Sequence, residues 1–209
     1  MAKNIFFFVD PMSYNNLALY DKLLLENLTP KPIFFFGNIK YEYKTSYDRH
    51  YKYIYSYSNK WRALKPLSYL LSQLILLYYI IKTRPSVIHF QWFKFPIVDY
   101  FLLKIISLFL NKVKIVYTVH NVLPHNTVNT HKYIYEKIYK IVHKIIIHDQ
   151  YSKNILSKSF NIKPLKIHVI PHGILPIKKK KLFKNNCVWL IYSSTKKPSR
   201  SVIFKASSY

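Results

Sequence analysis

The stretch Val113-Lys-Ile-Val-Tyr-Thr-Val-His-Asn121, followed by Val-Leu-Pro-His125, decides the fold class. Its apolar and β-branched residues form a run typical of a buried strand, and a proline ends the segment shortly afterwards. The run leads directly into His120 and Asn121, so these two polar side chains lie at the carboxyl end of the strand. In open α/β sheets, ligands bind at that edge.

A second segment, Ser86-Val-Ile-His-Phe-Gln-Trp92, ends in the same way, because its apolar run leads into Gln91 and Trp92. Amide side chains pair with hydroxyl groups, and aromatic faces stack on sugar rings. A tryptophan that packs under a loop explains Trp92 equally well. Two polar strand ends in one chain indicate a shared ligand-binding edge more strongly than either alone.

Apolar runs that alternate with helical spacers indicate a parallel sheet covered by helices on both faces, which is an α/β Rossmann-like fold. The pattern continues to Ile170. Strands are expected at 5–9, 32–36, 87–90, 114–119, 144–147 and 167–170, and a half-exposed strand with its loops within 41–58. Helices are expected at 14–28, 61–82, 97–111, 132–142 and 152–159.

Composition places the chain among folded proteins of a reducing compartment. Half of its 209 residues are apolar, and Cys187 is the single cysteine, so no disulfide framework exists within the chain. The apolar run at residues 5–9 is too short for a signal peptide. Residues 67–81 are strongly apolar but number only 15, short of the roughly 20 that span a bilayer. A cytoplasmic location is expected.

The net charge of +25 has two interpretations. Nucleic-acid binding is disfavoured, because only four arginines occur and the lysines are spread along the chain rather than gathered in one basic groove. Dispersed lysines together with Tyr and Trp suit an anionic membrane surface, which predicts peripheral attachment to the inner face of the cell membrane. A non-catalytic basic α/β module that binds such a surface or nucleic acid is the alternative to an enzyme.

Cofactor and metal chemistry have no support in the sequence. The nine histidines show no metal-ligand spacing with cysteine or paired carboxylates. Phosphate-binding lysine loops and dinucleotide fingerprints are absent, and the chain contains only two glycines. No metal and no resident cofactor are expected.

Five segments, in this order and spacing, resemble the amino-terminal domain of family-4-type glycosyltransferases of the GT-B fold: 8–17 (FVDPMSYNNL), 84–89 (RPSVIH), 117–125 (YTVHNVLPH), 148–153 (HDQYSK) and 169–173 (VIPHG). The resemblance covers about residues 3 to 177. It implies transfer of a sugar from a nucleotide sugar, as co-substrate, to a polysaccharide or lipid-linked acceptor. It also implies two Rossmann-like domains with the active site between them, of which the amino-terminal domain holds mostly the acceptor.

The resemblance assigns roles to the strand-end residues. His120 is expected beside the transferred sugar as the catalytic residue, since an imidazole can donate or accept a hydrogen bond and change charge near neutral pH. Acceptor contacts are expected from Gln91, Trp92, Asn121, His125 and Asp149. An ordinary solvated histidine at a strand end remains the alternative for His120.

Two further segments have expected roles. The loop with Tyr14, Asn15 and Asn16 stands where the family usually has a glycine-rich loop that approaches the donor's phosphates, and a helix N-terminus can hold a phosphate there. A plain helix cap by Ser13 or Asn15 explains the same loop. His172 and Gly173 are expected at the hinge toward a second domain, because glycine supplies backbone freedom.

Two domains are expected, an acceptor-side domain at 1–177 and a basic tail at 178–209 that is either a flexible extension or an aberrant remnant of a donor domain. The family's two-glutamate donor motif cannot be placed, since no glutamate follows Glu136. A truncated or frame-disrupted gene, with little or no transfer by this chain alone, is therefore expected. A separate polypeptide that supplies the donor half is a further interpretation.

Overall fold

The structure, a computed structural model, describes residues 5–12, 24, 27–28, 32–37, 51–55, 64–123 and 129–171. The chain divides into two units, Met1–Gly173 and Ile174–Tyr209, and all described residues belong to the first. The predicted boundary after residue 177 and the predicted tail lie outside the described residues.

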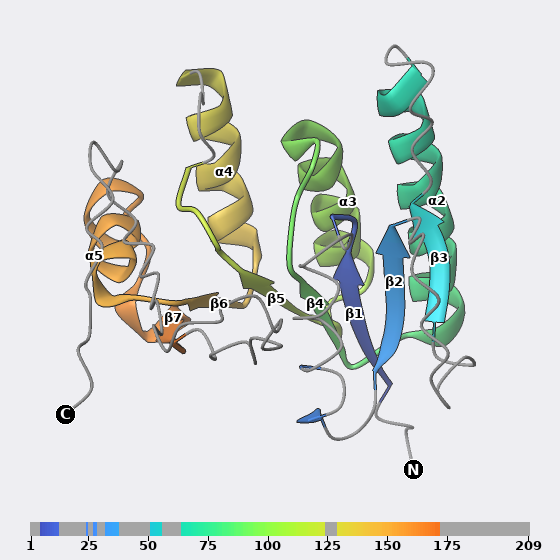
Figure 1. Ribbon diagram of the computed structural model, residues 1–209, viewed down its shortest axis with the longest axis horizontal. Helices are drawn as coiled ribbons and strands as arrows, with labels where there is room; N and C mark the ends of the chain where they lie inside the picture. The colour runs from blue at the N-terminus through green and yellow to red at the C-terminus, as the bar shows by residue number, and fades with distance from the viewer. Residues whose placement is uncertain are drawn as a thin grey trace, which may run out of the picture. The chain divides into compact units, whose positions relative to one another are not determined.

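From the third strand onward, the described elements alternate between strands and helices, as the sequence pattern predicted (Figure 1). The helix expected at 14–28 lies largely outside the described residues. The strands are β1 (Phe6–Asp10), β2 (Ile33–Gly37), β3 (Tyr51–Tyr55), β4 (Val87–Phe90), β5 (Lys114–Thr118), β6 (Lys144–Ile147) and β7 (Ile167–Val169). The helices are α2 (Lys65–Thr83), α3 (Pro96–Phe109), α4 (Asn129–Ile141) and α5 (Gln150–Ser159), and a short 3-10 helix (Pro164–Lys166) precedes β7.

All seven strands are parallel and follow the order β3-β2-β1-β4-β5-β6-β7. The chain first moves outward from β1 to β2 and β3 and then returns to the other side of β1, where β4 pairs with it. Ser86 Oγ donates to the Ile5 carbonyl across 81 positions at 3.0 Å, which joins these sequence-distant strands. The reversal between β1 and β4 is the topological switch point, beside which ligands bind in folds of this class.

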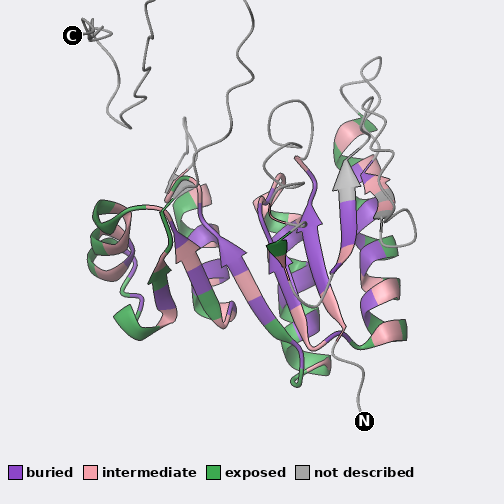
Figure 2. Ribbon diagram, turned by 60° about the horizontal axis from the view of Figure 1, so that its bottom comes forward, coloured by how far each residue is buried: buried purple, intermediate pink, exposed green. Residues whose placement is uncertain are grey.

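The parallel strands with their connecting helices confirm the predicted α/β Rossmann-like fold class. The main core joins α2, α3, α4 and α5 to one face through side chains such as Phe7, Leu76, Leu103 and Ile138. On the opposite face, Leu24 and Leu28 pack on Phe8 and Phe34. Successive strand residues point to opposite faces, so Phe7 and Phe8 belong to different clusters. Figure 2 shows the central strands mostly buried, with exposed residues at the beginning of the later ones.

Helix boundaries differ from the predicted ones for local reasons. Helix α3 begins at Pro96, because proline has a suitable φ angle and needs no amide partner in the first turn. Helix α2 ends where Arg84 adopts a left-handed conformation with φ 45° and its amide donates to Ile80 O at 2.8 Å. Among the described residues, no helix combines the length and hydrophobicity needed to cross a membrane.

Candidate functional site

The carboxyl ends of β4 and β5 bring Gln91 and His120 into contact. The Gln91 amide donates to Val9 O at 2.9 Å, which continues the ladder between β1 and β4 and fixes the backbone at this point. The Gln91 side chain is 1% exposed, and its Oε1 lies 2.9 Å from His120 Nε2. This contact between the Gln91 amide and the ring fixes the orientation of the imidazole at the strand end.

Trp92 covers one ring face of His120. The two rings are stacked, with 4.3 Å between centroids and 9° between planes. Trp92 is half-buried, and its strand end lies beside that of His120 because β4 pairs with β5. The structure therefore brings together three of the predicted site residues, Gln91, Trp92 and His120.

His148, at the end of β6, is a fourth member that the sequence analysis did not select. Its ring centroid lies 5.1 Å from that of His120, with 41° between the planes. Its Nδ1 donates to the Ile170 carbonyl at 2.8 Å, and the Ile170 amide donates to Ile147 O at 2.7 Å. These bonds hold His148 between the ends of β6 and β7. A histidine directly after an apolar run was the available signal.

Asp10 ends β1 at the topological switch point and was also missed as a site residue. The side chain is 1% exposed, and its Oδ1 accepts a hydrogen bond from the Met12 amide at 2.7 Å. Such an Asx turn leads the chain out of a strand. Asp10 thus shapes the start of the loop in which phosphate binding was predicted. Its position directly after the first apolar run was the signal.

The remaining predicted residues divide into two groups. Asn121 is exposed beside His120, and Asp149 is exposed after β6. Asp149 has a clear structural role, since its Oδ1 accepts from the Ser152 amide at 2.7 Å and its Oδ2 from Ser152 Oγ at 2.8 Å, which caps α5. The predicted residues that lie outside the described residues are Tyr14, Asn15, Asn16, His125, His172 and Gly173.

His89 is a buried histidine of β4, two residues before Gln91 and therefore on the same face of the strand but one step farther from its carboxyl end. Its Nε2 is 2.7 Å from Thr118 Oγ1, and its ring contacts Phe8 edge to face at 5.0 Å between centroids. Burial lowers the pKa of His89 to about 4, so the ring is neutral at physiological pH. This histidine belongs to the packing of the sheet and not to the candidate site.

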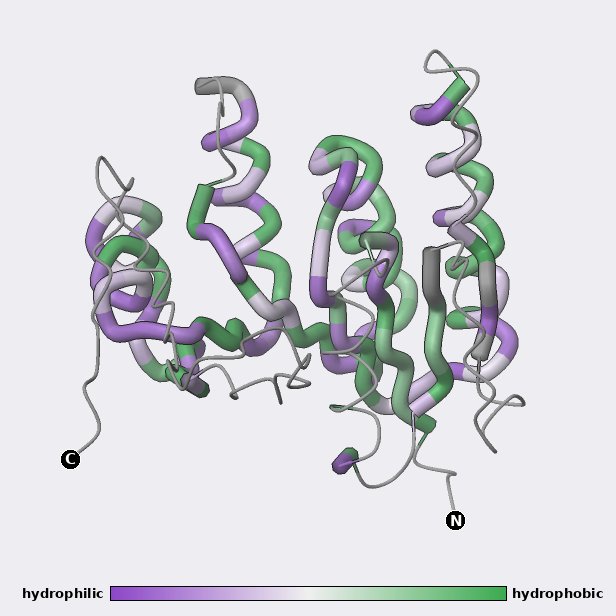
Figure 3. Tube along the Cα trace, in the orientation of Figure 1, coloured by the Kyte–Doolittle hydropathy of each residue, from purple (hydrophilic) through white to green (hydrophobic). Residues whose placement is uncertain are grey.

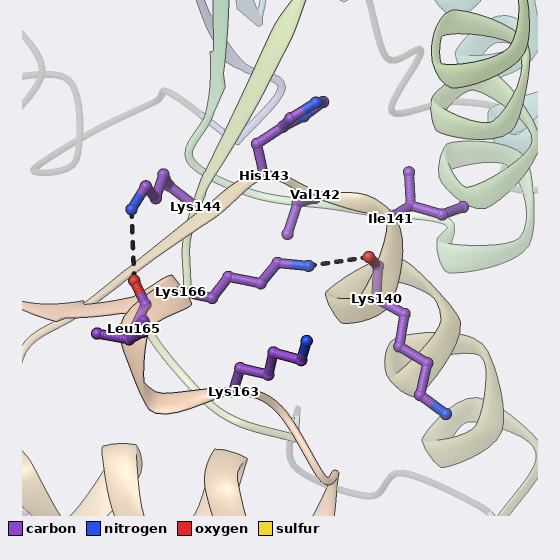
Figure 4. A pocket seen from close by; sticks show the side chains of 8 residues that line it. All are labelled: Lys140, Ile141, Val142, His143, Lys144, Lys163, Leu165 and Lys166. Carbon is purple, nitrogen blue, oxygen red and sulfur yellow. Dashed lines mark hydrogen bonds between the residues drawn. The ribbon is translucent and has the colours of Figure 1, made fainter. Parts of the chain in front are cut away.

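A basic hollow of about 410 Å³ lies at the opposite edge of the sheet (Figure 4). Its lining residues precede β6 and β7 and include His143, Lys144, Lys163 and Lys166. Lys166 Nζ donates to the Lys140 carbonyl at 2.8 Å, and burial lowers the pKa of Lys166 to about 8. Because parallel strands all run in one direction, this hollow is separate from the cluster at the carboxyl edge.

No group of three or more His, Cys, Asp or Glu side chains within the described residues has the arrangement of a metal site. The carboxyl-edge cluster offers hydrogen-bonding groups from Gln91 and His120 and an aromatic face from Trp92.

Comparison with known families decides the class of the chain. A model of Glycosyltransferase Family 4 matches residues 37–176, about two thirds of the sequence. The chain belongs to this family. The matched range contains β3 to β7 and the whole Gln91–Trp92–His120–His148 cluster. No curated protein matches the chain at a significant level.

Solved structures agree with the family on the fold. The *Anabaena* protein Alr3699/HepE, in complex with UDP and glucose, is 13% identical with a TM-score of 0.52, over 81% of this chain and 44% of that one. A glycosyltransferase from *Rickettsia africae* ESF-5 is 18% identical with a TM-score of 0.50, over 83% of this chain and 44% of that one. The family 4 chain thus spans less than half the length of these solved structures.

Proposed function

We propose that this chain supplies the acceptor-binding half of a sugar transferase, in which His120 lies beside the reacting hydroxyl group. The observation that carries the proposal is the contact of Gln91, Trp92 and His120 at the carboxyl edge of a family 4 domain. Gln91 orients the ring through its hydrogen bond, and the stacked Trp92 covers one face of it. In this proposal the imidazole exchanges a hydrogen bond with a sugar hydroxyl of the acceptor.

In this proposal the donor is a nucleotide sugar held by a second domain opposite this edge, either farther along a longer chain or in a separate polypeptide. Family membership and the likeness to a fold that binds UDP and glucose in HepE support this choice of donor. A glycan or glycolipid is the proposed acceptor. Rate acceleration would come mainly from positioning of the hydroxyl and stabilisation of the leaving diphosphate.

Saturation-transfer NMR on the 209-residue protein, with glucose and N-acetylglucosamine as probes, tests the acceptor half of this proposal. We expect weak binding that His120→Ala and Trp92→Ala each reduce roughly tenfold, the effect of removing one good polar or stacking partner. His168→Ala is the matched control, because His168 is exposed on β7 away from the cluster. Equal signals from His120→Ala and His168→Ala would overturn the assignment of His120.

Turnover of UDP-glucose by the purified protein tests whether a separate donor domain is required. Little or no turnover is expected if a separate donor domain is required. Rapid hydrolysis or transfer by this chain alone would contradict the division into halves while leaving the acceptor site intact. The acceptor site and the need for a donor domain can therefore be refuted separately.

A further inference from the structure

Helix α2 buries two polar side chains and leaves several large apolar ones exposed. Its polar Ser72 and Gln73 are 3% exposed, whereas Leu71 and Leu74 are each 53% exposed. The polar pair is held inside by hydrogen bonds, since Ser72 Oγ donates to Ile54 O at 2.6 Å and Gln73 donates to a buried carboxylate of α3. Packing on the sheet therefore does not account for the exposed leucines.

The exposed apolar side chains of α2 form a regular stripe. Leu67, Leu71, Leu74, Tyr78 and Ile81 are all more than half exposed and follow one another at intervals of three or four residues. This spacing places them on one side of the helix, over a length of about 21 Å. Figure 3 shows the hydrophobic colouring along this helix.

Helix α3 continues the apolar surface beside α2. Phe101, Ile105, Leu108 and Phe109 are exposed on it, and Phe109 is 78% exposed. The two helices are joined by the hydrogen bond from Tyr69 to Asp99 and pack on the same face of the sheet. We call the exposed apolar residues of both helices the α2–α3 face. Contiguous apolar surface of this extent marks an interaction site.

The exposed charges carried by α2 and α3 are all positive. The single acidic residue of these two helices, Asp99, is fully buried, and Glu136 of the neighbouring α4 is paired with Lys140. Lys82 and Lys104 are exposed on α2 and α3 themselves. A second copy of the chain, docked through the same face, would bring like charges together without acidic partners. An anionic lipid surface instead pairs with the lysines and accepts the apolar side chains.

We propose that the α2–α3 face docks on an anionic membrane. The apolar stripe of α2 is then inserted among the lipids, and Lys82 and Lys104 lie at the head groups. Helix α3 begins at Pro96, a few residues after Trp92 and at the same edge of the sheet, so docking would hold the candidate site near the lipid surface. Membrane docking does not depend on sugar transfer. Together with the proposed function, it favours a lipid-linked acceptor.

Vesicle flotation of the 209-residue protein tests this docking. The vesicles are phosphatidylcholine alone or with about 30 mol% phosphatidylglycerol, a fraction that gives a negative surface potential. We expect binding to the anionic vesicles only, with steep weakening as the salt concentration rises from about 0.05 to about 0.5 M. Absence of binding to the anionic vesicles overturns the proposal.

Two variants distinguish docking through the α2–α3 face from nonspecific adsorption of exposed apolar side chains. Leu71→Gln/Leu74→Gln/Tyr78→Gln should weaken vesicle binding at least roughly tenfold, because the inserted apolar area is lost. Tyr151→Gln/Leu165→Gln is the control, since these side chains are 73% and 88% exposed but lie outside the face. Circular dichroism confirms that both variants fold. Equal weakening of the two, or none in the first, contradicts the proposal.

A lysine variant tests the electrostatic part. Lys82→Gln/Lys104→Gln should weaken binding to anionic vesicles by about 25-fold, at about fivefold for each cation near the surface. Light scattering on the same proteins measures the oligomeric state. A dimer that only the α2 substitutions dissociate, with vesicle binding unchanged, would show that a second copy occupies the face and would overturn the membrane proposal.

Discussion

Trp92 and His120 stack face to face with 4.3 Å between ring centroids, although they follow different strands. The stacked imidazole shields one face of the indole from water. In a Trp61→Phe/Trp189→Phe background, Trp92 is the only remaining indole of the chain's three. We predict that His120→Ala opens this face and shifts the emission of Trp92 to longer wavelength. His168→Ala should leave the emission unchanged, and identical spectra for His120→Ala and the parent protein would contradict the prediction.

Tyr139 anchors the segment that carries His120. This buried side chain donates from its hydroxyl group to Val122 O at 2.6 Å. Tyr139→Phe leaves that carbonyl without the bond and should lower the free energy of unfolding by about 1 kcal/mol, with a change in Trp92 emission. Tyr133→Phe on the same helix, where the ring is 59% exposed, should change neither quantity. Urea unfolding and fluorescence together make the measurement.

Asp149 provides a test that separates capping from ligand binding. Asp149→Ala should cost about 1 kcal/mol of stability, whereas Asp149→Ser should retain most of it, because serine also caps helices. If Asp149 also contacts the acceptor, the serine variant keeps its stability but loses sugar binding in the NMR experiment. Unchanged stability in the alanine variant would contradict the capping role.

Asp99 should make stability fall with pH near neutrality. Burial raises the pKa of its carboxyl group to about 8, although hydrogen bonds from Tyr69, Phe95 and Gln73 oppose the shift. The folded state therefore holds a proton that the unfolded chain has already lost. The contribution of this proton to the free energy of unfolding is fully present below the pKa that the carboxyl group has in the unfolded chain. It is lost as the pH rises through about 8.

The wild type and Asp99→Asn are compared between about pH 6.5 and 8. His89 titrates in the unfolded chain near 6.5 and Lys166 in the folded chain near 8, and both contribute alike to the two proteins. Relative to Asp99→Asn, the wild-type chain should therefore lose roughly 1.5 kcal/mol across this range. Urea unfolding at several pH values measures the difference. A wild-type curve that parallels that of the variant would show that Asp99 is already ionised at the low end.

His89 should act in the opposite direction in acid. Because burial lowers its pKa from 6.5 to about 4, its contribution to stability is present above 6.5 and is lost as the pH falls toward 4. Over the same range the Asp99 contribution grows, so the wild-type chain should show a plateau. In Asp99→Asn the acid loss should become visible, at about 3 kcal/mol. A plateau in the variant as well would contradict the assignment.

The position of the site could be predicted from the sequence because parallel strands align their ends. His120 and Gln91 each follow an apolar run, and that pattern alone placed them at one edge. The order of the strands could not be predicted, since hydrophobic periodicity does not encode which strands are neighbours. Asp149 illustrates another limit, because an aspartate after a strand can cap a helix or contact a ligand.

The side of α2 that faces the sheet could not be predicted either. Residues 67–81 are apolar almost all round, so the sequence showed no preferred face. The buried side is set by Gln73 and Ser72, whose hydrogen-bond partners come from α3 and β3 and are invisible in the local pattern. Tertiary partners of this kind override the usual expectation that polar residues of a helix face solvent.

The central place of β1 has a consequence for the nascent chain. Ser86, which bonds to Ile5, emerges from the ribosome only after 81 further positions have been translated. At typical synthesis rates this takes roughly 4 to 16 s. Phe7 and Phe8 can meet β2 early, but their second neighbouring strand arrives only after this interval, during which an unpaired strand edge is open to aggregation. The first strand of the chain therefore becomes an interior strand of the sheet only once the fourth has been translated.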